Sequence, residues 1–498
     1  MNLIEKIESK SAKVCVIGLG YVGLPLAVEK AKAGYNVIGI DIQKDKVDLV
    51  NSGHNYIGDV LEDDLKHLVD AGILKATTDF DVIKECDVAT ICVPTPLNKF
   101  KQPDVSYIVS TSEEILKRMH KDMLIILEST TYPGTTEEVL LPILLRSGLK
   151  VGSDFYLAFS PERVDPGNKL YKTKNTPKVV GGVTSACTKH AVALYEKVLE
   201  APVFAASTPG VAEMEKILEN TFRIVNIALI NEMAILCDKM NIDIWEVIEA
   251  AKTKPYGFMP FYPGAGVGGH CIPIDPFYLT YKAREYDYHT RLIELAGEIN
   301  DSMAEFVVMN KLMKALNKYG KPLKGSKVLL LGVTYKADID DMRESPALKV
   351  LQELMKYGVD VSYSDPYVPE VNIKIDRLDN LDSALDAETE DLVPSCHSAL
   401  DAESSDLVPS CHSALDAESR NLFISKKNGQ TNEGNIIKFE SQLLTPELLS
   451  SLDAVIILAP HSSFDYEMLV KNTKLIIDTK NTLSKYKFNN ISAEIIKL

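Results

Sequence analysis

Residues 13–41 read KVCVIGLGYVGLPLAVEKAKAGYNVIGID, which is the pattern of a strand, a glycine-rich turn, a helix and a second strand. The turn contains Gly18, Gly20 and Gly23 in a GxGxxG spacing. In such a turn the first glycine permits a tight bend, the second admits a pyrophosphate, and the third lets helix and strand pack closely. The stretch therefore predicts a dinucleotide-binding α/β unit.

Asp41, at the end of the second strand, indicates which dinucleotide the turn binds. It lies 18 residues after Gly23, where a carboxylate hydrogen-bonds the adenosine ribose hydroxyls and repels a 2′-phosphate. The alternative is a purely structural glycine-rich turn in which Asp41 is only a cap. Because strand, turn, helix and acid occur together in the required order, we expect NAD as the cofactor rather than NADP.

The alternation of strands and helices continues beyond this stretch and returns later in the chain. Short β-branched segments alternate with helical ones, which predicts a parallel, doubly wound sheet. From Gly210 the apolar residues follow a helical period, and no proline interrupts a long helix over 211–239. A second helical block covers 290–319, and the alternation restarts after Gly325.

We therefore expect an α/β protein with two Rossmann-like doubly wound domains joined by a long central helix. The 498 residues suffice for about three domains. The expected domains are a first α/β domain over 1–205, a central helical domain over 206–318 and a second α/β domain over 319–498.

One segment, 382–436, does not fit this plan. It contains a SALDAE repeat whose copies begin at Ser383, Ser398 and Ser413, a period of 15 residues. The copies are polar and shorter than the units of solenoid proteins. The two Cys-His pairs within them lack the spacing of a zinc site. We expect a repetitive insertion in the second α/β domain, either a solvated loop or a weakly ordered helix.

The composition excludes several classes of function. The net charge of −16 leaves no basic footprint for nucleic acid. No apolar run of about 18 residues occurs, so no membrane-spanning helix is expected, and the polar first residues lack the apolar core of a signal peptide. The eight cysteines form no CxxC pair, which predicts free thiols in a reducing cytoplasm and no bound metal.

The glycine-rich stretch GAGVGGHCIPIDP over 264–276 presents one cysteine, Cys271, followed by Asp275. Glycines let a backbone approach a ligand closely, and a thiol beside polar groups can act as a covalent nucleophile. The alternative is a structural turn around an inert cysteine. Together with a nicotinamide cofactor, a catalytic thiol predicts oxidation of an alcohol past the aldehyde to the acid.

Three further groups of polar residues can each be interpreted either as functional or as purely structural. Lys216 and Asn220 are four residues apart on the long helix and share one face, from which they could stabilise an oxyanion, although spacing alone favours a solvated polar face. Glu162 could orient water or hold a sugar, or it is a surface acid in a turn. Lys336 and Arg343 precede a helix, a good position for an anion, or they lie in a charged surface loop.

Seven motifs occur in one consistent order along the chain. They are GLGYVGLP at 18–25, VPTP at 93–96, ESTTYPGTT at 128–136, SPERVDPG at 160–167, EMEKILENTFRIVNIALINE at 213–232, GAGVGGHCIPIDP at 264–276 and GVTYKADIDDMRESPA at 332–347. In this the chain resembles the UDP-glucose/GDP-mannose dehydrogenase family, over nearly its whole length except the insertion. SPERVDPG and the cysteine motif resemble the branch that acts on UDP-N-acetylhexosamines. UDP-N-acetylglucosamine is the expected substrate, with UDP-N-acetylmannosamine and UDP-glucose as alternatives.

The resemblance implies a four-electron oxidation of the sugar C6 alcohol to the uronate, for surface polysaccharide biosynthesis. Cys271 would form a thiohemiacetal and then a thioester, and two NAD molecules would each take up a hydride. The first domain would bind NAD and the third the UDP-sugar. The central domain would carry the cysteine loop and form a homodimer through the 211–239 helix.

The resemblance also implies a role for individual residues. Lys216 and Asn220 would stabilise oxyanions, Asp275 would assist proton transfer, and Thr130 and Glu162 would position water. The implied catalytic residues are Cys271, Lys216, Asn220, Asp275, Glu162 and Thr130. The implied cofactor contacts are Gly18, Gly20, Tyr21, Val22, Gly23, Asp41, Thr95 and Arg343. The implied substrate contacts are Glu162, Lys216, Tyr262, Gly268 and Lys336.

Two other functions compete with this reading. A two-electron NAD dehydrogenase of the 6-phosphogluconate or hydroxyacid type also pairs a Rossmann domain with a long helix, but it uses a lysine and no essential cysteine. A non-catalytic nucleotide-binding remnant would result if the insertion had disrupted the second α/β domain. Every implied catalytic residue is present, which argues against the remnant.

Overall fold

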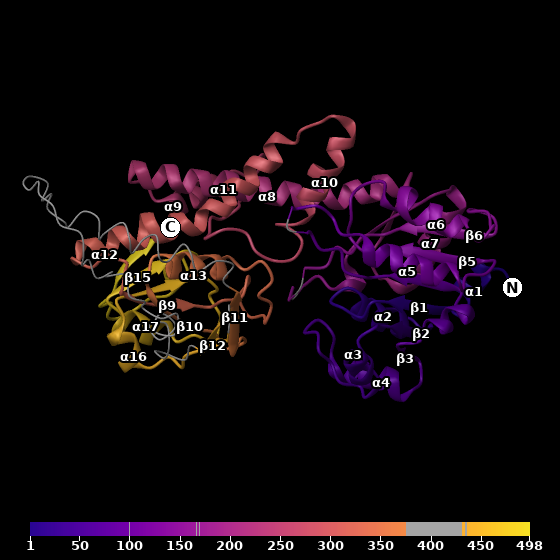
Figure 1. Ribbon diagram of the computed structural model, residues 1–498, viewed down its shortest axis with the longest axis horizontal. Coiled ribbons are helices and arrows are strands. Elements are labelled where there is room, and N and C mark those ends of the chain that lie inside the picture. Colours follow the sequence, from indigo (N-terminus) through magenta and orange to yellow (C-terminus); the bar gives the residue numbers. More distant parts are fainter. Residues whose placement is uncertain (99, 166, 169, 375–430, 434–435) are drawn as a thin grey trace, which may run out of the picture. The chain divides into compact units, whose positions relative to one another are not determined.

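The structure is a computed structural model that describes residues 1–98, 100–165, 167–168, 170–374, 431–433 and 436–498 (Figure 1). The chain divides into two compact units, which we describe separately. Unit 1 consists of Met1–Asn226 and His270–Glu298, and unit 2 consists of Ile227–Gly269 and Ile299–Leu498. The domain limits expected from the sequence, at 205 and 318, stay a prediction.

Unit 1 is built on an eight-stranded sheet. Its strands are β1 Lys13–Ile17, β2 Asn36–Ile40, β3 Leu74–Thr77, β4 Val88–Ile91, β5 Met123–Leu127, β6 Phe155–Phe159, β7 Lys178–Gly182 and β8 Val203–Ala206. Their order is β3-β2-β1-β4-β5-β6-β7-β8. Neighbouring strands are parallel except for β6 and β7, which are antiparallel. The sequence predicts the parallel part, but not the reversal at β7.

Both faces of this sheet are covered by helices, because its strands are apolar on both sides. Val14 and Val16 of β1 pack in one buried cluster, while Cys15 and Ile17 pack in another on the opposite face. Such double burial is typical of a parallel sheet in an α/β protein. The helices of unit 1 are α1 Leu3–Glu8, α2 Gly23–Lys32, α3 Lys44–Asn51, α4 Glu62–Asp70, η1 Phe80–Glu85, α5 Ser106–Leu116, η2 Thr136–Leu140, α6 Leu141–Leu145, η3 Thr173–Asn175, α7 Ser185–Val198, α10 Asp275–Ala283 and η4 Arg284–Tyr286.

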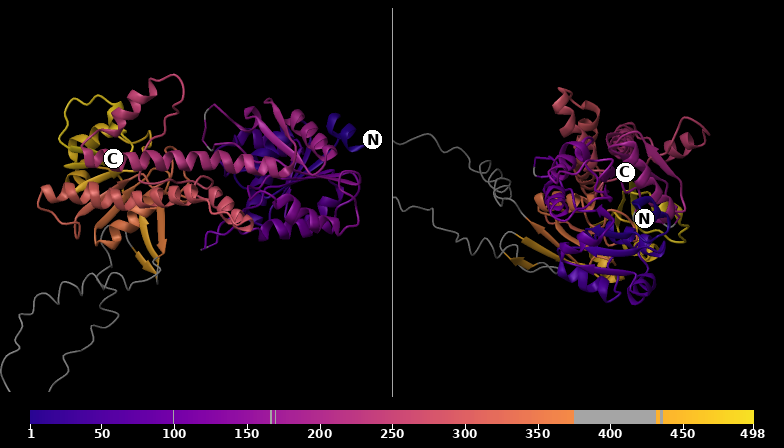
Figure 2. Two further views of the ribbon diagram at one scale, coloured as in Figure 1. Left: turned by 90° about the horizontal axis from the view of Figure 1, so that it is seen from above. Right: turned by 90° about the vertical axis from the view of Figure 1, so that its right-hand side faces the viewer.

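Two helices belong in part to each unit. α8 runs without a break over Pro209–Met240, close to the predicted 211–239 (Figure 2, left). α11 covers Arg291–Glu305. The predicted block over 290–319 is helical throughout, but a π-helical segment, η5 Phe306–Met313, separates α11 from α12 Lys314–Lys318.

Unit 2 repeats the two-faced construction with a five-stranded parallel sheet. Val328 and Leu330 pack in one buried cluster, whereas Leu329 and Leu331 pack in another. Its strands are β9 Lys327–Leu331, β10 Asp360–Ser364, β14 Ala454–Ile457, β15 Leu475–Asp478 and β16 Glu494–Lys497, in the order β10-β9-β14-β15-β16. Besides η5, α12 and its parts of α8 and α11, the described helices of unit 2 are α9 Ile244–Lys252, α13 Pro346–Lys356, α16 Pro446–Ser451, α17 Tyr466–Asn472 and η7 Leu483–Lys485.

A small antiparallel sheet adjoins the predicted insertion. It has the order β11-β13-β12, with β11 Glu370–Lys374, β12 Thr431–Glu433 and β13 Ile436–Glu440. The part of the insertion that the structure describes, 431–433 and 436, therefore lies in strands and not in a loop or helix. The rest of the insertion lies outside the described residues.

The two units share one local arrangement after their first strand. In unit 1 the N–H of Leu19 donates to Oδ2 of Asp41 at 2.8 Å, and in unit 2 the N–H of Val333 donates to Oδ2 of Asp365 at 2.7 Å. In both units the acid directly follows the second strand, and a glycine of positive φ precedes the donor. This likeness confirms the predicted fold class of two Rossmann-like doubly wound domains. Among the described residues, no helix is long and apolar enough to span a membrane.

Candidate active site

The three glycines of the GxGxxG turn have different surroundings. A Cβ on Gly18 would lie 2.5 Å from the carbonyl oxygen of Cys92, and one on Gly23 would lie 1.8 Å from that of Gly18. Both positions therefore require glycine for packing, and Gly18 also has φ +92°. A Cβ on Gly20 would meet no atom within 4 Å. The turn is thus open at Gly20, where a pyrophosphate would approach the backbone.

The residues around this turn fit NAD. Tyr21 is exposed beside Gly20, and Val22 immediately precedes α2. Asp41 is buried, and its Oδ1 also accepts a hydrogen bond of 2.9 Å from the N–H of Gln43, which fixes the carboxylate at the end of β2. In unit 2 the equivalent Asp365 is instead bonded to a histidine, so the turn of unit 1 is the better dinucleotide site.

We expect Asp41→Ala to raise the Kd for NAD by about ten- to a hundredfold, because a charged hydrogen bond to the ribose is lost. The discrimination against NADP should weaken at the same time, since the repulsion of the 2′-phosphate is also lost. Fluorescence titration with both cofactors measures this. Asp45→Ala, which removes an exposed carboxylate on α3, is the matched control. Unchanged affinities in Asp41→Ala would contradict the assignment of the turn.

Thr95 and Thr130 lie in turns that follow neighbouring strands. Thr95 is buried in the segment after β4, and its Oγ1 donates to the carbonyl of Thr130, after β5, at 2.6 Å. The hydroxyl of Tyr278 on α10 donates to the carbonyl of Thr95. These bonds join α10 to the carboxyl edge of the sheet, where ligands of open α/β sheets bind.

Lys216, Asn220 and Asp275 form a buried polar group in unit 1. All three are less than 10 % exposed. The amide Nδ2 of Asn220 on α8 donates to Oδ2 of Asp275, the first residue of α10, at 2.6 Å. The alternative of a solvated polar face for Lys216 and Asn220 is therefore wrong.

Cys271 lies one turn before this group. Its carbonyl accepts the N–H of Asp275 at 2.8 Å, so the cysteine lies in the turn that leads into α10. It is exposed, whereas the other five cysteines in the described part of the chain are buried. A helix N-terminus favours a negative charge, which suits a thiolate.

Burial raises the pKa of Asp275 to about 7, against the opposing effects of the Lys216 charge and the Asn220 hydrogen bond. A carboxyl group with this pKa exists in both protonation states near neutral pH. It can therefore accept a proton and return it, which is the property of an effective general acid–base.

Glu162 is held in place by its own loop and by an ion pair. Its Oε1 accepts the N–H groups of Arg163 and Val164 at 2.9 and 3.0 Å, and its Oε2 lies 3.3 Å from Nζ of Lys178. Its side chain is 14 % exposed. The alternative of a surface acid in a turn is wrong.

In unit 2 the glycine-rich loop packs against the edge of the five-stranded sheet. A Cβ on Gly268 would lie 2.7 Å from atoms of Tyr335 and Pro346, and one on Gly264 would lie 2.5 Å from Nζ of Lys480. Burial lowers the pKa of Lys480. Tyr262 is exposed, and its ring stacks on that of Trp245 at 6.0 Å between centroids. The glycines thus let aromatic groups and a cation come close to the loop backbone.

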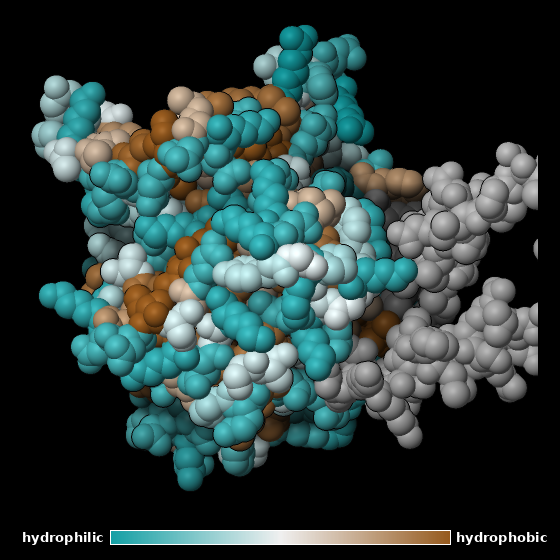
Figure 3. All heavy atoms as spheres, turned by 90° about the vertical axis from the view of Figure 1, so that its left-hand side faces the viewer, coloured by the Kyte–Doolittle hydropathy of each residue, from teal (hydrophilic) through white to brown (hydrophobic). Residues whose placement is uncertain are grey.

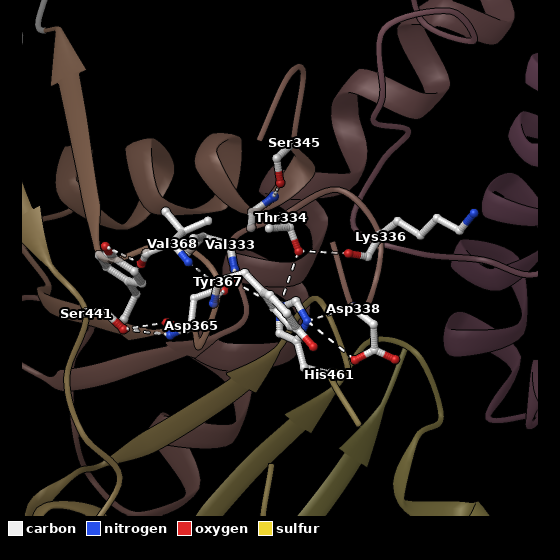
Figure 4. Close-up of polar contacts among 12 residues, drawn as sticks. Val333, Thr334, Lys336, Asp338, Ser345, Asp365, Tyr367, Val368, Ser441 and His461 are labelled. Atoms are coloured by element: carbon white, nitrogen blue, oxygen red, sulfur yellow. Dashed lines mark hydrogen bonds and ion pairs between the residues drawn. The ribbon is translucent and has the colours of Figure 1, made fainter. Parts of the chain in front are cut away.

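A buried histidine organises the segment after β9. Nε2 of His461 lies 3.0 Å from Oδ2 of Asp365, and its Nδ1 accepts the N–H of Asp338 at 2.9 Å. Because Nδ1 is an acceptor, the proton is on Nε2 and is directed at Asp365. The hydroxyl of Thr334 donates to the carbonyl of Lys336 at 2.8 Å. Figure 4 shows that the Lys336 side chain points away from this cluster.

Arg343 lies in the same segment of unit 2. Its guanidinium pairs with both carboxylate oxygens of the buried Asp341, at 2.6 to 3.0 Å. Its carbonyl accepts the N–H of Gly269 at 3.1 Å, which connects the segment to the glycine-rich loop. The Arg343 side chain is 41 % exposed, so the alternative of a charged surface loop also fits this segment, which these contacts hold in place. The proposed contact of Arg343 with the cofactor stays a prediction.

Comparison with known proteins identifies the family to which the chain belongs. Models of the UDP-glucose/GDP-mannose dehydrogenase family match the chain in three parts: the NAD binding domain over 12–199, the central domain over 210–302 and the UDP binding domain over 329–402. The chain belongs to the UDP-glucose/GDP-mannose dehydrogenase family. It is accordingly an NAD-dependent nucleotide-sugar dehydrogenase.

Individual relatives agree with this membership. The chain is 42 % identical to a UDP-N-acetyl-D-glucosamine 6-dehydrogenase from Pseudomonas aeruginosa over 72 % of its length and 84 % of the relative. It is 38 % identical to a UDP-N-acetyl-D-mannosamine dehydrogenase from Campylobacter jejuni, over 74 % and 90 %. A solved UDP-D-ManNAc dehydrogenase from Pyrococcus horikoshii superposes with a TM-score of 0.76 at 30 % identity, covering 97 % of this chain and 99 % of the other.

Reasoning from the sequence missed three features of this dehydrogenase. They are the ion pair of Lys178 with Glu128, the pair of His461 with Asp365, and Lys480. A sequence signal existed only for Asp365, which directly follows its strand in unit 2 as Asp41 does in unit 1. The other contacts join residues far apart in the chain, so no local spacing could reveal them.

Proposed function

We propose that the enzyme oxidises the C6 alcohol of a UDP-N-acetylhexosamine, most readily UDP-N-acetylglucosamine, to the uronate. The proposal is carried by the position of Cys271 one turn before α10, whose first residue, Asp275, is bonded to Asn220. It is supported by the relatives named above, which act on N-acetylated UDP-sugars. The product would serve surface polysaccharide assembly in the cytoplasm.

The first oxidation requires a base and a stabilised oxyanion. Asp275 accepts the proton of the C6 hydroxyl, while Lys216 and Asn220 stabilise the negative charge that develops on that oxygen. NAD, held by the GxGxxG turn and Asp41, supplies a hydride acceptor when it is bound. The product of this step is the aldehyde.

The second oxidation requires Cys271. Its thiolate adds to the aldehyde carbon and forms a thiohemiacetal, whose oxygen is stabilised by the same lysine and asparagine. Loss of a second hydride leaves a thioester on Sγ. Water, oriented by Glu162 and Thr130, then attacks the carbonyl carbon and releases the uronate.

We propose that unit 2 binds the UDP part of the substrate. Lys336 and Lys480 follow the carboxyl ends of β9 and β15, which lie at the same edge of one parallel sheet. Their charges suit a diphosphate. Gly268 lets the loop backbone approach the substrate, and Tyr262 offers an aromatic face. Arg343 is proposed to reach the cofactor.

An NADH-formation assay across UDP-sugars tests the substrate. The expected order of kcat/KM is UDP-N-acetylglucosamine first, then UDP-N-acetylmannosamine, with UDP-glucose lowest. UDP-glucose lacks the acetamido group. A site that hydrogen-bonds this group is left with unpaired buried polar groups when UDP-glucose binds, which strengthens discrimination against UDP-glucose. Highest activity on UDP-glucose would overturn the assignment while leaving the family membership intact.

We also propose a homodimer formed through α8. On the face that Figure 3 shows, brown hydrophobic surface lies among teal hydrophilic surface, but the proposal rests on the exposed residues of α8. The exposed apolar residues of α8 recur at spacings of three, four and seven, which places them along one stripe of the helix. They are Val211, Met214, Leu218, Phe222, Leu229, Leu236 and Met240. Sedimentation equilibrium should give twice the chain mass, and a concentration-independent monomer would contradict the proposal.

A further inference from the structure

Lys178 is a buried cation between two carboxylates, and the steps above do not use it. Its Nζ lies 2.6 Å from Oε2 of Glu128 and 3.3 Å from Oε2 of Glu162. The side chains of Lys178 and Glu128 are 4 % and 0 % exposed. Replacing a buried ion pair by apolar residues of the same size is often neutral or stabilising, so a gain in stability is a weak explanation for this cluster.

The reversal of strand direction at β7 produces this contact. Glu128 directly follows β5, and Glu162 comes shortly after β6, so both acids lie at the carboxyl edge of the sheet. β7 is antiparallel to β6, with Phe159 opposite Gly181. The first residue of β7, Lys178, is thereby brought back to the edge where both acids lie. A parallel strand would place its first residue at the other edge.

Glu128, the partner of Lys178, is itself held by a further hydrogen bond. The hydroxyl of Tyr195 on α7 donates to Oε1 of Glu128, the oxygen that Lys178 does not contact. Lys30 on α2 is also buried and donates to Oγ1 of Thr90 at 2.5 Å. Both carboxylate oxygens of Glu128 are thus engaged, one by Tyr195 and one by Lys178, and the same ammonium group also contacts Glu162.

We propose that Lys178 is a positioning residue for the Glu162 carboxylate and that Glu128 is its anchor. Oε2 of Glu162 is held by Lys178 and Oε1 by two backbone N–H groups, so the plane of the carboxylate is fixed. This rests on the proposed function, in which Glu162 orients the water that hydrolyses the thioester. In that step water adds to the carbonyl carbon, and one of its protons passes to Glu162. The C–S bond then breaks with its electron pair on Sγ of Cys271.

The charges of the cluster support this role. Burial by itself would raise the pKa of Glu162, but Lys178 and the two N–H groups outweigh it and lower the pKa. Glu162 is thereby kept ionised and able to accept a proton. The other charged or titratable groups that face the cluster are Glu128 after β5, Lys30 on α2, Tyr195 on α7, Cys92 after β4 and Arg163 in the loop of Glu162.

The test is the acyl-enzyme that forms when hydrolysis fails. Lys178→Met is mixed with NAD and UDP-N-acetylglucosamine, quenched, and analysed by mass spectrometry of the peptide that contains Cys271. We expect an acyl adduct on most active sites, a burst of two NADH per site, and steady turnover lowered about 10²-fold or more. Lys178→Arg, which keeps the charge, should deacylate far faster than Lys178→Met.

Lys30→Met is the matched control, because it removes a buried cation of the same cluster that does not contact Glu162. It should show no adduct even if its thermal stability falls. Should Lys178→Met fold poorly, the Glu128→Gln/Lys178→Met double variant leaves no unpaired Glu128 and should still accumulate the adduct. Slow turnover without an adduct in a folded variant would show that Lys178 is merely structural.

Glu162→Gln separates this proposal from the one on which it rests. If Glu162→Gln accumulates the adduct and the Lys178 variants do not, the positioning role is wrong. If Glu162→Gln shows no adduct, the assigned role of Glu162 is wrong. Raising the pH from about 7 to about 9 should speed deacylation more in Lys178→Met than in Glu162→Gln, because only the former keeps a carboxyl group that can ionise again.

Discussion

Cys271→Ser should lower the steady-state rate by a factor on the order of 10³ to 10⁶, the range seen when a covalent nucleophile is removed. Serine keeps the geometry, but its hydroxyl is a far weaker nucleophile than a thiolate at neutral pH. An ester also hydrolyses more slowly than a thioester. The reaction should therefore stop after the first hydride transfer or trap an ester adduct, and mass spectrometry with NADH counting distinguishes the two.

Cys237→Ser is the control for the loss of a thiol, since Cys237 is buried on the unit 2 part of α8 and has no role in the proposed chemistry. It should turn over as the wild type does. Full turnover in Cys271→Ser, with two NADH per sugar, would contradict the thioester route. Cys271 would then be an inert cysteine in a structural turn, whereas full turnover with one NADH per sugar would favour a lysine-based two-electron type of site.

Asp275→Asn should lower kcat by about 10²- to 10⁴-fold, the usual contribution of a general acid–base. In the wild type, kcat should rise with pH through an ionisation near pH 7, because the reaction uses the ionised carboxylate and its pKa is raised to about 7. The variant should lack this dependence. Asn220→Ala should move the ionisation to higher pH, since the hydrogen bond from Asn220 lowers the pKa of Asp275. A pH profile of kcat measures all three.

The raised pKa of Asp275 also makes the stability of the folded protein depend on pH. A carboxyl group whose pKa is higher in the folded state favours folding most below its unfolded value, and this contribution is lost as the pH rises through about 7. Asp275→Asn should therefore gain stability relative to the wild type from about pH 4 to about pH 7, by at most about 4 kcal/mol, and the difference should stay constant above that range. Denaturant unfolding at several pH values checks this, and a difference that is constant within that range as well would contradict the assigned pKa.

Local patterns made the dinucleotide turn and the long helix predictable. Gly18, Gly23 and Asp41 act within one strand–turn–helix–strand unit, so their spacing carries the whole signal. The uninterrupted apolar period of α8 likewise gave its length to within a few residues. The i, i+4 spacing of Lys216 and Asn220 predicted a shared face but not its burial, because burial depends on α10, which follows much later in the chain.

Contacts between distant parts of the chain were not predictable in this way. The bond of Asn220 to Asp275 joins residues 55 apart, and that of Lys178 to Glu128 joins residues 50 apart. The second contact also depends on the antiparallel direction of β7, whereas a regular alternation of strands and helices indicates parallel strands. His461 and Asp365 are 96 residues apart and are separated by the insertion.

In the proposed mechanism one active site carries out both oxidations through Cys271. The most direct measurement is the amount of NADH formed when a limiting, known amount of UDP-N-acetylglucosamine is consumed completely in excess NAD. Two NADH per sugar, with no free aldehyde captured by an added hydrazine, is the predicted result. One NADH per sugar, or release of the aldehyde, would contradict the account.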